Sequence, residues 1–263
     1  MRLFKLLTIL TLFFIQAHSI ELKTDKDSIL ALGIEMSTMR NMLKSYILIG
    51  AKTIYDDDEK PILKQGIIEY EDLLYALHIK YTQYRRIQIS IKTSISAWKH
   101  VRNAMELALK NETPAKMKEG ALFIHANIRT VIREMESMKQ FLLQQSNIKY
   151  RNALNATIEI AASARRLSAH YMMSLWHLND PTIVKHWNKG ISIYSNSLKI
   201  LQYSTFTQDP RFNQLFTQSS ESLKYLIKMY KKPKIYYTLV NRSAEKAFVD
   251  AEKMTQMILN YKQ

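Results

Sequence analysis

Three arginines, Arg40, Arg165 and Arg166, lie beside apolar stripes of helical spacing. A guanidinium group offers a planar fork of hydrogen-bond donors that matches a carboxylate, a phosphate or another oxyanion. Arg165 shares a helical face with small and apolar side chains between Ile158 and Met172, which places its charge at the edge of a core. The spacing therefore indicates an anion site. The alternative is structural: an internal salt bridge, or a side chain that lays its stem on apolar surface and reaches water with its charge.

The spacing of the other polar residues gives little support to other chemistry. No two histidines lie three or four residues apart, the spacing that aims two imidazoles of one helix at a metal ion. Glu159, Arg166 and His170 share a helical face, which fits a polar pocket or, alternatively, a solvated surface. The run from Asp56 to Glu59 lacks the alternation and the glycine of a calcium loop. No phosphate-binding glycine loop, serine elbow or catalytic constellation occurs, so no enzyme activity, metal or cofactor is predicted.

The elements that carry these residues are predicted to be helices throughout. The 263 residues include only 5 glycines and 5 prolines, and a β protein needs such residues for its frequent turns. Apolar residues recur at steps of three and four from Leu32 to Ile47, as in a helix that faces a bundle core. The predicted helices cover residues 25–55, 61–80, 84–110, 114–178, 181–203, 210–231 and 236–262.

The fourth of these helices is the longest, because no proline follows Pro114 before Pro181. As one helix of about 60 residues it would be close to 90 Å long, at about 1.5 Å per residue. A break near Asn147 is the alternative.

Two stretches recur in the same order and indicate one helical module written twice. Residues 66–77 and 190–201 share the frame G-I-x-x-Y-x-[D/N]-x-L-x-x-L, and residues 136–143 and 252–259 share E-x-M-x-Q-x-x-L. The offsets, 124 and 116 residues, are those of a small domain rather than of a solenoid repeat. The predicted fold is all-α. It consists of two tandem four-helix bundles, residues 20–145 and 146–263, joined end to end through the long shared helix.

Residues 1–19 have the features of a cleavable signal peptide. Arg2 and Lys5 precede an apolar run from Leu6 to Ile15, and Ala17 and Ser19 supply the small residues of a cleavage site. An uncleaved anchor is the alternative. The chain contains no cysteine, which rules out disulfides and thiolate metal sites. An exported bacterial protein commonly lacks disulfides, so we predict a periplasmic protein.

The formal net charge of +15 includes Arg2 and Lys5, so the exported chain carries 15 − 2 = +13. Such a charge favours phosphate groups, acidic polymers or an acidic partner, and a solvated basic surface is the alternative. Nucleic acid, the other usual partner of a basic chain, is not expected, because the export signal argues against it and no compact basic and aromatic run occurs.

The segment 165–176, followed by Asn179-Asp180-Pro181, resembles the sensor domain of type IV pili methyl-accepting chemotaxis transducers, the PilJ-type domain, which is related to nitrate and nitrite sensor ectodomains. The first module is similar to the same pattern at Gly33, Met42, Lys44 and Tyr46. The resemblance covers nearly all of the exported chain as two degenerate copies. It implies a helical fold and a sensory or ligand-binding role, and it adds Lys44 to the candidate ligand residues.

The chain departs from this family at the position that binds nitrate. The arginine that precedes the first motif methionine in the nitrate sensors is replaced by Met36 in the first module and by Ala161 in the second. The ligand candidates are therefore Arg40, Lys44, Arg165 and Arg166.

We expect a periplasmic, non-enzymatic sensory or ligand-binding module for a small anion that acts through an envelope or signalling partner. A homodimer is compatible with this expectation. The alternative is a structural or adaptor protein of the cell envelope without a small ligand.

Overall fold

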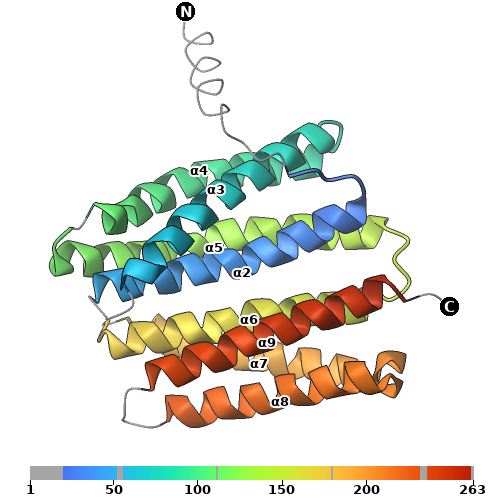
Figure 1. Ribbon diagram of the computed structural model, residues 1–263. Helices are drawn as coiled ribbons and strands as arrows, with labels where there is room; N and C mark the ends of the chain where they lie inside the picture. Colours follow the sequence, from blue (N-terminus) through green and yellow to red (C-terminus); the bar gives the residue numbers. More distant parts are fainter. Residues whose placement is uncertain (1–19, 52–55, 111, 179, 232–235, 262–263) are drawn as a thin grey trace, which may run out of the picture.

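The computed structural model describes residues 20–51, 56–110, 112–178, 180–231 and 236–261, and these residues form helices joined by short connections (Figure 1). The predicted targeting segment, residues 1–19, lies outside the described residues. No strand occurs in the described ranges, and the all-α prediction is confirmed. The elements are α2 (Asp25–Gly50), α3 (Asp56–Lys80), α4 (Arg85–Leu109), α5 (Pro114–Gln145), α6 (Arg151–Leu175), α7 (Thr182–Gln202), the 3-10 turn η1 (Thr205–Gln208), α8 (Pro210–Tyr230) and α9 (Tyr237–Leu259).

Local sequence signals explain where several helices begin. The Thr24 hydroxyl accepts a hydrogen bond from the backbone N–H of Asp27, and the Asp27 carboxylate accepts one from the backbone N–H of Thr24. This capping box makes Thr24 the N-cap, and α2 begins at Asp25, where the sequence predicted the start of the helix. Pro114 and Pro210 open α5 and α8, where the missing N–H of proline costs no helical hydrogen bond.

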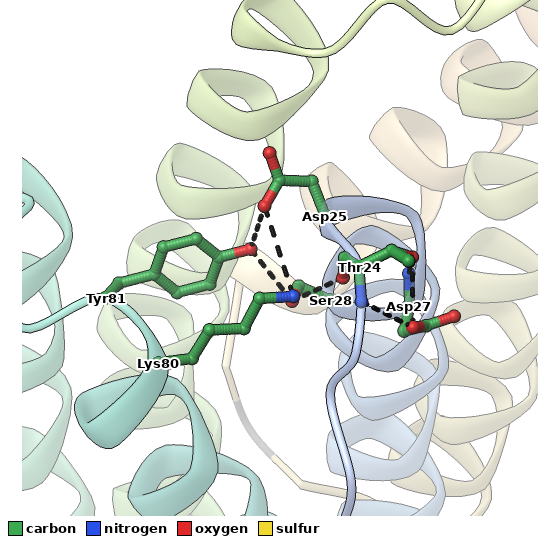
Figure 2. A network of polar contacts seen from close by, with 6 residues as sticks. All are labelled: Thr24, Asp25, Asp27, Ser28, Lys80 and Tyr81. Atoms are coloured by element: carbon green, nitrogen blue, oxygen red, sulfur yellow. Dashed lines mark hydrogen bonds and ion pairs between the residues drawn. The ribbon is translucent and has the colours of Figure 1, made fainter.

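A polar network ties the start of α2 to the end of α3 (Figure 2). The Tyr81 hydroxyl lies 2.6 Å from Oδ1 of Asp25 and 2.9 Å from Oγ of Ser28. Lys80 donates to the same Ser28 hydroxyl over 3.1 Å. These contacts fix the register of the first two helices.

The second helix, α3, begins at Asp56 rather than at residue 61 as predicted, so its first turn includes the acidic run from Asp56 to Glu59.

Successive helices run in opposite directions (Figure 1), so α2 and α6 point the same way. In the first half of the chain, α2 packs on α3 and α5, α5 packs on α4, and α3 touches α4. In the second half, α6 packs on α7 and α9, α9 packs on α8, and α7 touches α8. The two sets therefore have the same order of neighbours, and α2 packs along α6 where they meet. The recurring sequences occupy matching helices, α3 with α7 and α5 with α9.

The predicted long shared helix, and with it the end-to-end joining of two bundles, is wrong. The chain leaves α5 at Gln145 and turns back into α6 at Arg151, near the alternative break at Asn147. The Ser146 hydroxyl donates a hydrogen bond to the carbonyl oxygen of Leu143. The backbone of Ser146 is extended, and the helix ends there. The reversal lets α6 bury its apolar face against α2, whereas a straight helix would leave that face in water.

One hydrophobic core runs through both sets of helices. Its largest fully buried side chains include Tyr46 of α2, Tyr70 of α3 and Tyr194 of α7. Because the core is continuous across α2 and α6, these two helices form the spine that positions the candidate site.

Candidate functional site

A cleft of about 580 Å³ opens where α5 and α7 flank the α2–α6 spine. We call it the arginine cleft. Its lining includes five cationic side chains and two carboxylates, a balance of 5 − 2 = +3 among these lining groups. They are Arg40, Arg129, Arg133, Arg166, Lys189, Glu136 and Glu159. Apolar residues such as Met36 and Ile193 complete the wall. An excess of positive charge against an apolar wall suits an anion.

Arg40 crosses from one set of helices to the other. It projects from α2, is 4 % exposed, and donates from Nη1 to the carbonyl oxygen of Ala162 on α6. Burial lowers the pKa of Arg40, and so does the charge of Arg166, while Glu159 opposes the change. An arginine keeps its charge in proteins even so, so Arg40 contributes a fixed positive charge to the cleft.

Arg166 has a buried donor that no protein group satisfies among the described residues. Its Nη1 nitrogen is buried and has no hydrogen-bond partner among the described residues. Burial lowers the pKa of Arg166, and the carboxylates Glu159 and Glu136 act in the opposite direction without a direct hydrogen bond to it. A buried donor of a charged group without a partner is costly, and an oxyanion in the cleft would supply that partner.

The carboxylate of Glu159 is held by a lysine instead. Lys139 on α5 is fully buried, and its Nζ lies 2.7 Å from Oε1 of Glu159 and 2.7 Å from Oε2 of Glu136. Burial opposes the charged form of Glu159, but the charges of Lys139 and Arg40 and the hydrogen bond from Lys139 outweigh it and lower its pKa. Glu159 therefore stays ionised, and its negative charge lies beside the arginines of the cleft.

The other two predicted ligand residues lie on the opposite side of the spine, against α9. Arg165 Nη2 is 2.9 Å from Oε2 of Glu245, and its guanidinium stacks 3.4 Å from the centre of the Phe248 ring. Lys44 donates to Asn241 over 2.9 Å and lies 3.5 Å from Oε1 of Glu245. Burial raises the pKa of Glu245, but Arg165 and Lys44 together hold it below its ordinary value. A protein carboxylate thus already occupies this side.

The structure splits the four predicted residues into two pairs. Arg40 and Arg166 line the arginine cleft, whereas Arg165 and Lys44 pair with Glu245. The predicted trio of Glu159, Arg166 and His170 does line the cleft. Consecutive residues of a helix point about 100° apart, which explains why neighbouring arginines serve different sides of α6.

Sequence reasoning missed the contributions of α5 and α7. His125, Arg129 and Arg133 follow one another at steps of four on α5, and His186 and Lys189 lie three apart on α7. These spacings place each group on one helical face. The sequence spacing could therefore have shown that each group shares one helical face. It could not show that the two groups line one cleft, because only the side-by-side packing of the helices brings them together.

Three histidines form the end of the cleft. Burial lowers the pKa of His125, of His170 to about 3 and of His186 to about 4. Nearby positive charge acts in the same direction, from Arg166 on His170 and from Arg129 on His186. The three imidazoles are therefore neutral at neutral pH.

Among the described residues, no helix has the length and apolar character needed to cross a membrane. No protein-family model matches the chain, and neither the curated proteins nor the solved structures contain a significantly similar protein.

Proposed function

We propose that this chain is a non-enzymatic sensory or ligand-binding module that holds a small oxyanion in the arginine cleft. The single observation that carries the proposal is the buried, unpartnered Nη1 of Arg166 beside the buried Arg40. On the opposite side of the spine, Glu245 satisfies the equivalent positive charges of Arg165 and Lys44. In the arginine cleft a ligand takes the place that Glu245 takes there.

The setting of this activity belongs to the same proposal. The predicted export signal, the absence of cysteine and the resemblance to PilJ-type sensor domains favour a periplasmic protein. The ligand-bound state would be read by a partner protein of the envelope, because the cleft is lined by α5 of one helix set and α7 of the other. One side of the cleft comes from α2 and α5 of the first helix set, and the other from α6 and α7 of the second. An anion bound between them would therefore affect the packing of the two sets.

A structural or adaptor role is the second candidate. It is favoured by the carboxylates of Glu159 and Glu136, which already offset part of the positive charge of Arg40 and Arg166. In that case the arginines strengthen the joint between the two helix sets and bind nothing.

Isothermal titration calorimetry with nitrate, nitrite, phosphate and small carboxylates separates the two candidates. We expect one anion to bind, and Arg166→Gln to weaken it about 10- to 150-fold, because a hydrogen bond to a charged group is worth about 1.5–3 kcal/mol. Arg165→Gln is the matched control, since the same side-chain type one residue away faces Glu245.

Circular dichroism of both variants verifies that helicity is retained. The proposal is wrong if none of these anions binds the wild type, or if Arg166→Gln binds the confirmed anion with unchanged affinity.

A further inference from the structure

The arginine cleft is much larger than a nitrate or phosphate ion. Its volume is about 580 Å³, whereas such an ion fills the space of roughly two or three water molecules, at about 30 Å³ each in the liquid. Clefts of about 300–1,000 Å³ with apolar walls and a few placed polar groups are typical of sites for organic molecules. The size therefore points to a ligand that has a body as well as a charged group.

The part of the lining that comes from α6 is polar. It consists of Asn155, Glu159, Arg166, Ala169 and His170, of which only the small alanine is apolar. Arg166 lies there with its buried Nη1, which has no partner among the described residues. A carboxylate or phosphate group bound at α6 would supply the acceptor that this donor lacks.

The large apolar side chains of the lining come from the other three helices, α2, α5 and α7. They are Met36, Leu43, Ile128, Ile132 and Ile193. Ile132 on α5 and Ile193 on α7 are only half-buried, so part of their apolar surface faces water. Covering such surface with a ligand is favourable. These walls therefore suit a hydrocarbon body, which an inorganic ion does not have.

A second buried polar atom without a partner lies on the α7 side of the cleft. Nε2 of His186 has no hydrogen-bond partner among the described residues, and Ile193 follows His186 two turns further along α7. The ring centres of His186 and of His170 on α6 are 5.8 Å apart, so α6 and α7 lie close together here. The incomplete polar groups of Arg166 and His186 thus favour a ligand that contacts both helices.

The exposed cations of the lining restrict the ligand to anions. Arg129, Arg133 and Lys189 are exposed, so they attract anions to the cleft from solution. Because they are hydrated, they add less to the affinity than the buried arginines do. A neutral molecule of the same shape would leave all of these charges unmatched.

We propose that the ligand of the arginine cleft is a small organic anion, with a carboxylate or phosphate group at Arg40 and Arg166 and an apolar body against Ile132 and Ile193. This inference rests on the proposed function, because it requires an anion to bind in the cleft. It adds that the affinity depends on the body and not on the charged group alone.

Calorimetric titrations of the wild type with acetate, propionate, butyrate and pentanoate test the role of the body. We expect each added methylene to strengthen binding by up to about fourfold, the effect of full burial, so that pentanoate binds roughly 10- to 60-fold more tightly than acetate. For the same reason n-butyl phosphate should bind more tightly than inorganic phosphate, and comparison of the two series shows which charged group is preferred. Butyramide, which lacks the charge of butyrate, should not bind measurably.

Ile193→Ser should reduce the gain per methylene, so that pentanoate loses at least fivefold more affinity than acetate does. Ile200→Ser is the matched control and should leave the series as in the wild type. Ile200 lies two turns after Ile193 on the same face of α7, is 47 % exposed and does not belong to the lining of the cleft. Circular dichroism verifies that both variants fold.

The failure of this inference and the failure of the proposed function give different results. Equal affinities along both the carboxylate and the phosphate series would overturn the organic ligand and leave the proposed function standing, and this comparison needs no variant. If no anion of either series or among the inorganic ions binds, the proposed function is wrong and the inference falls with it. Equal effects of Ile193→Ser and Ile200→Ser on the series would overturn the placement of the body.

Discussion

Arg165 and Arg166 are consecutive residues of α6, but their guanidinium groups lie in different surroundings. Arg165 stacks on Phe248 and pairs with Glu245, and so stabilises the contact between α6 and α9. Arg166 lines the arginine cleft, where its Nη1 has no acceptor among the described residues. The same residue type therefore pairs with a carboxylate at one position and has a buried donor without a partner at the next, which is why we propose Arg166 as the binding residue.

Glu159 is expected to make the protein acid-sensitive. Lys139 and Arg40 hold its pKa in the folded protein below the ordinary value of a glutamate, about 4.3, so the folded state favours the carboxylate. This stabilisation is present above about pH 4.3 and is lost as the pH falls through the lowered pKa of the folded protein.

Glu159→Gln should remove this pH dependence and, at pH 7, lower the free energy of unfolding by about 3–5 kcal/mol, because Lys139 is left buried with one partner fewer. Urea unfolding at pH 7, 5 and 3 measures both effects. Equal slopes with pH in wild type and variant would contradict this account of Glu159.

The arginines were predictable from the sequence as a chemical type but not as a site. Their place beside apolar stripes indicated an anion or a salt bridge, and the structure shows the salt bridge for Arg165. Nothing near Arg165 in the sequence points to Glu245, which is 80 residues away, because only the packing of α9 on α6 brings them together.

The α2–α6 contact is the element that creates the cleft, and Gly33 permits the close approach of these two helices. A Cβ atom at Gly33 would lie 2.7 Å from Cγ2 of Ile158 on α6. The glycine that the family pattern matches therefore has a packing role here.

Gly33→Ala should lower the free energy of unfolding by about 1–3 kcal/mol through overpacking, although alanine is the better helix former. In the double variant with Ile158→Ala, which removes the clashing atoms, the two effects should be less than additive by about 1 kcal/mol or more. Chemical denaturation of the four proteins of the cycle measures this coupling. Strict additivity would mean that α2 and α6 do not pack at Gly33.

The break between α5 and α6 was the element that the sequence predicted least well. Helical spacing continues through residues 114–178, and Ser146 and Asn147 are only weak signals of a helix end. A chain reversal there depends on the apolar face of α6 finding α2, which is a tertiary effect. The caps at Thr113 and Asp209, by contrast, depend on neighbouring residues and were close to their predicted places.

The whole molecule joins two helix sets of equal topology through one continuous core. The sequence repeats predicted the matching helices, since such patterns reflect local structure. They did not predict that the sets lie side by side, and the arginine cleft exists only because they do. The lining of this cleft comes from α2, α5, α6 and α7, so the proposed ligand would contact both helix sets at once.

The central claim is that a small oxyanion completes the hydrogen bonding of Arg166 in this cleft. Crystals soaked in selenate test it directly, because the anomalous scattering of selenium locates the anion. We predict a selenium peak in the arginine cleft with an oxyanion oxygen within hydrogen-bond distance of Arg166 Nη1. A peak only on the outer surface, or an Arg166 guanidinium already paired with a protein carboxylate in the crystal, would contradict the claim.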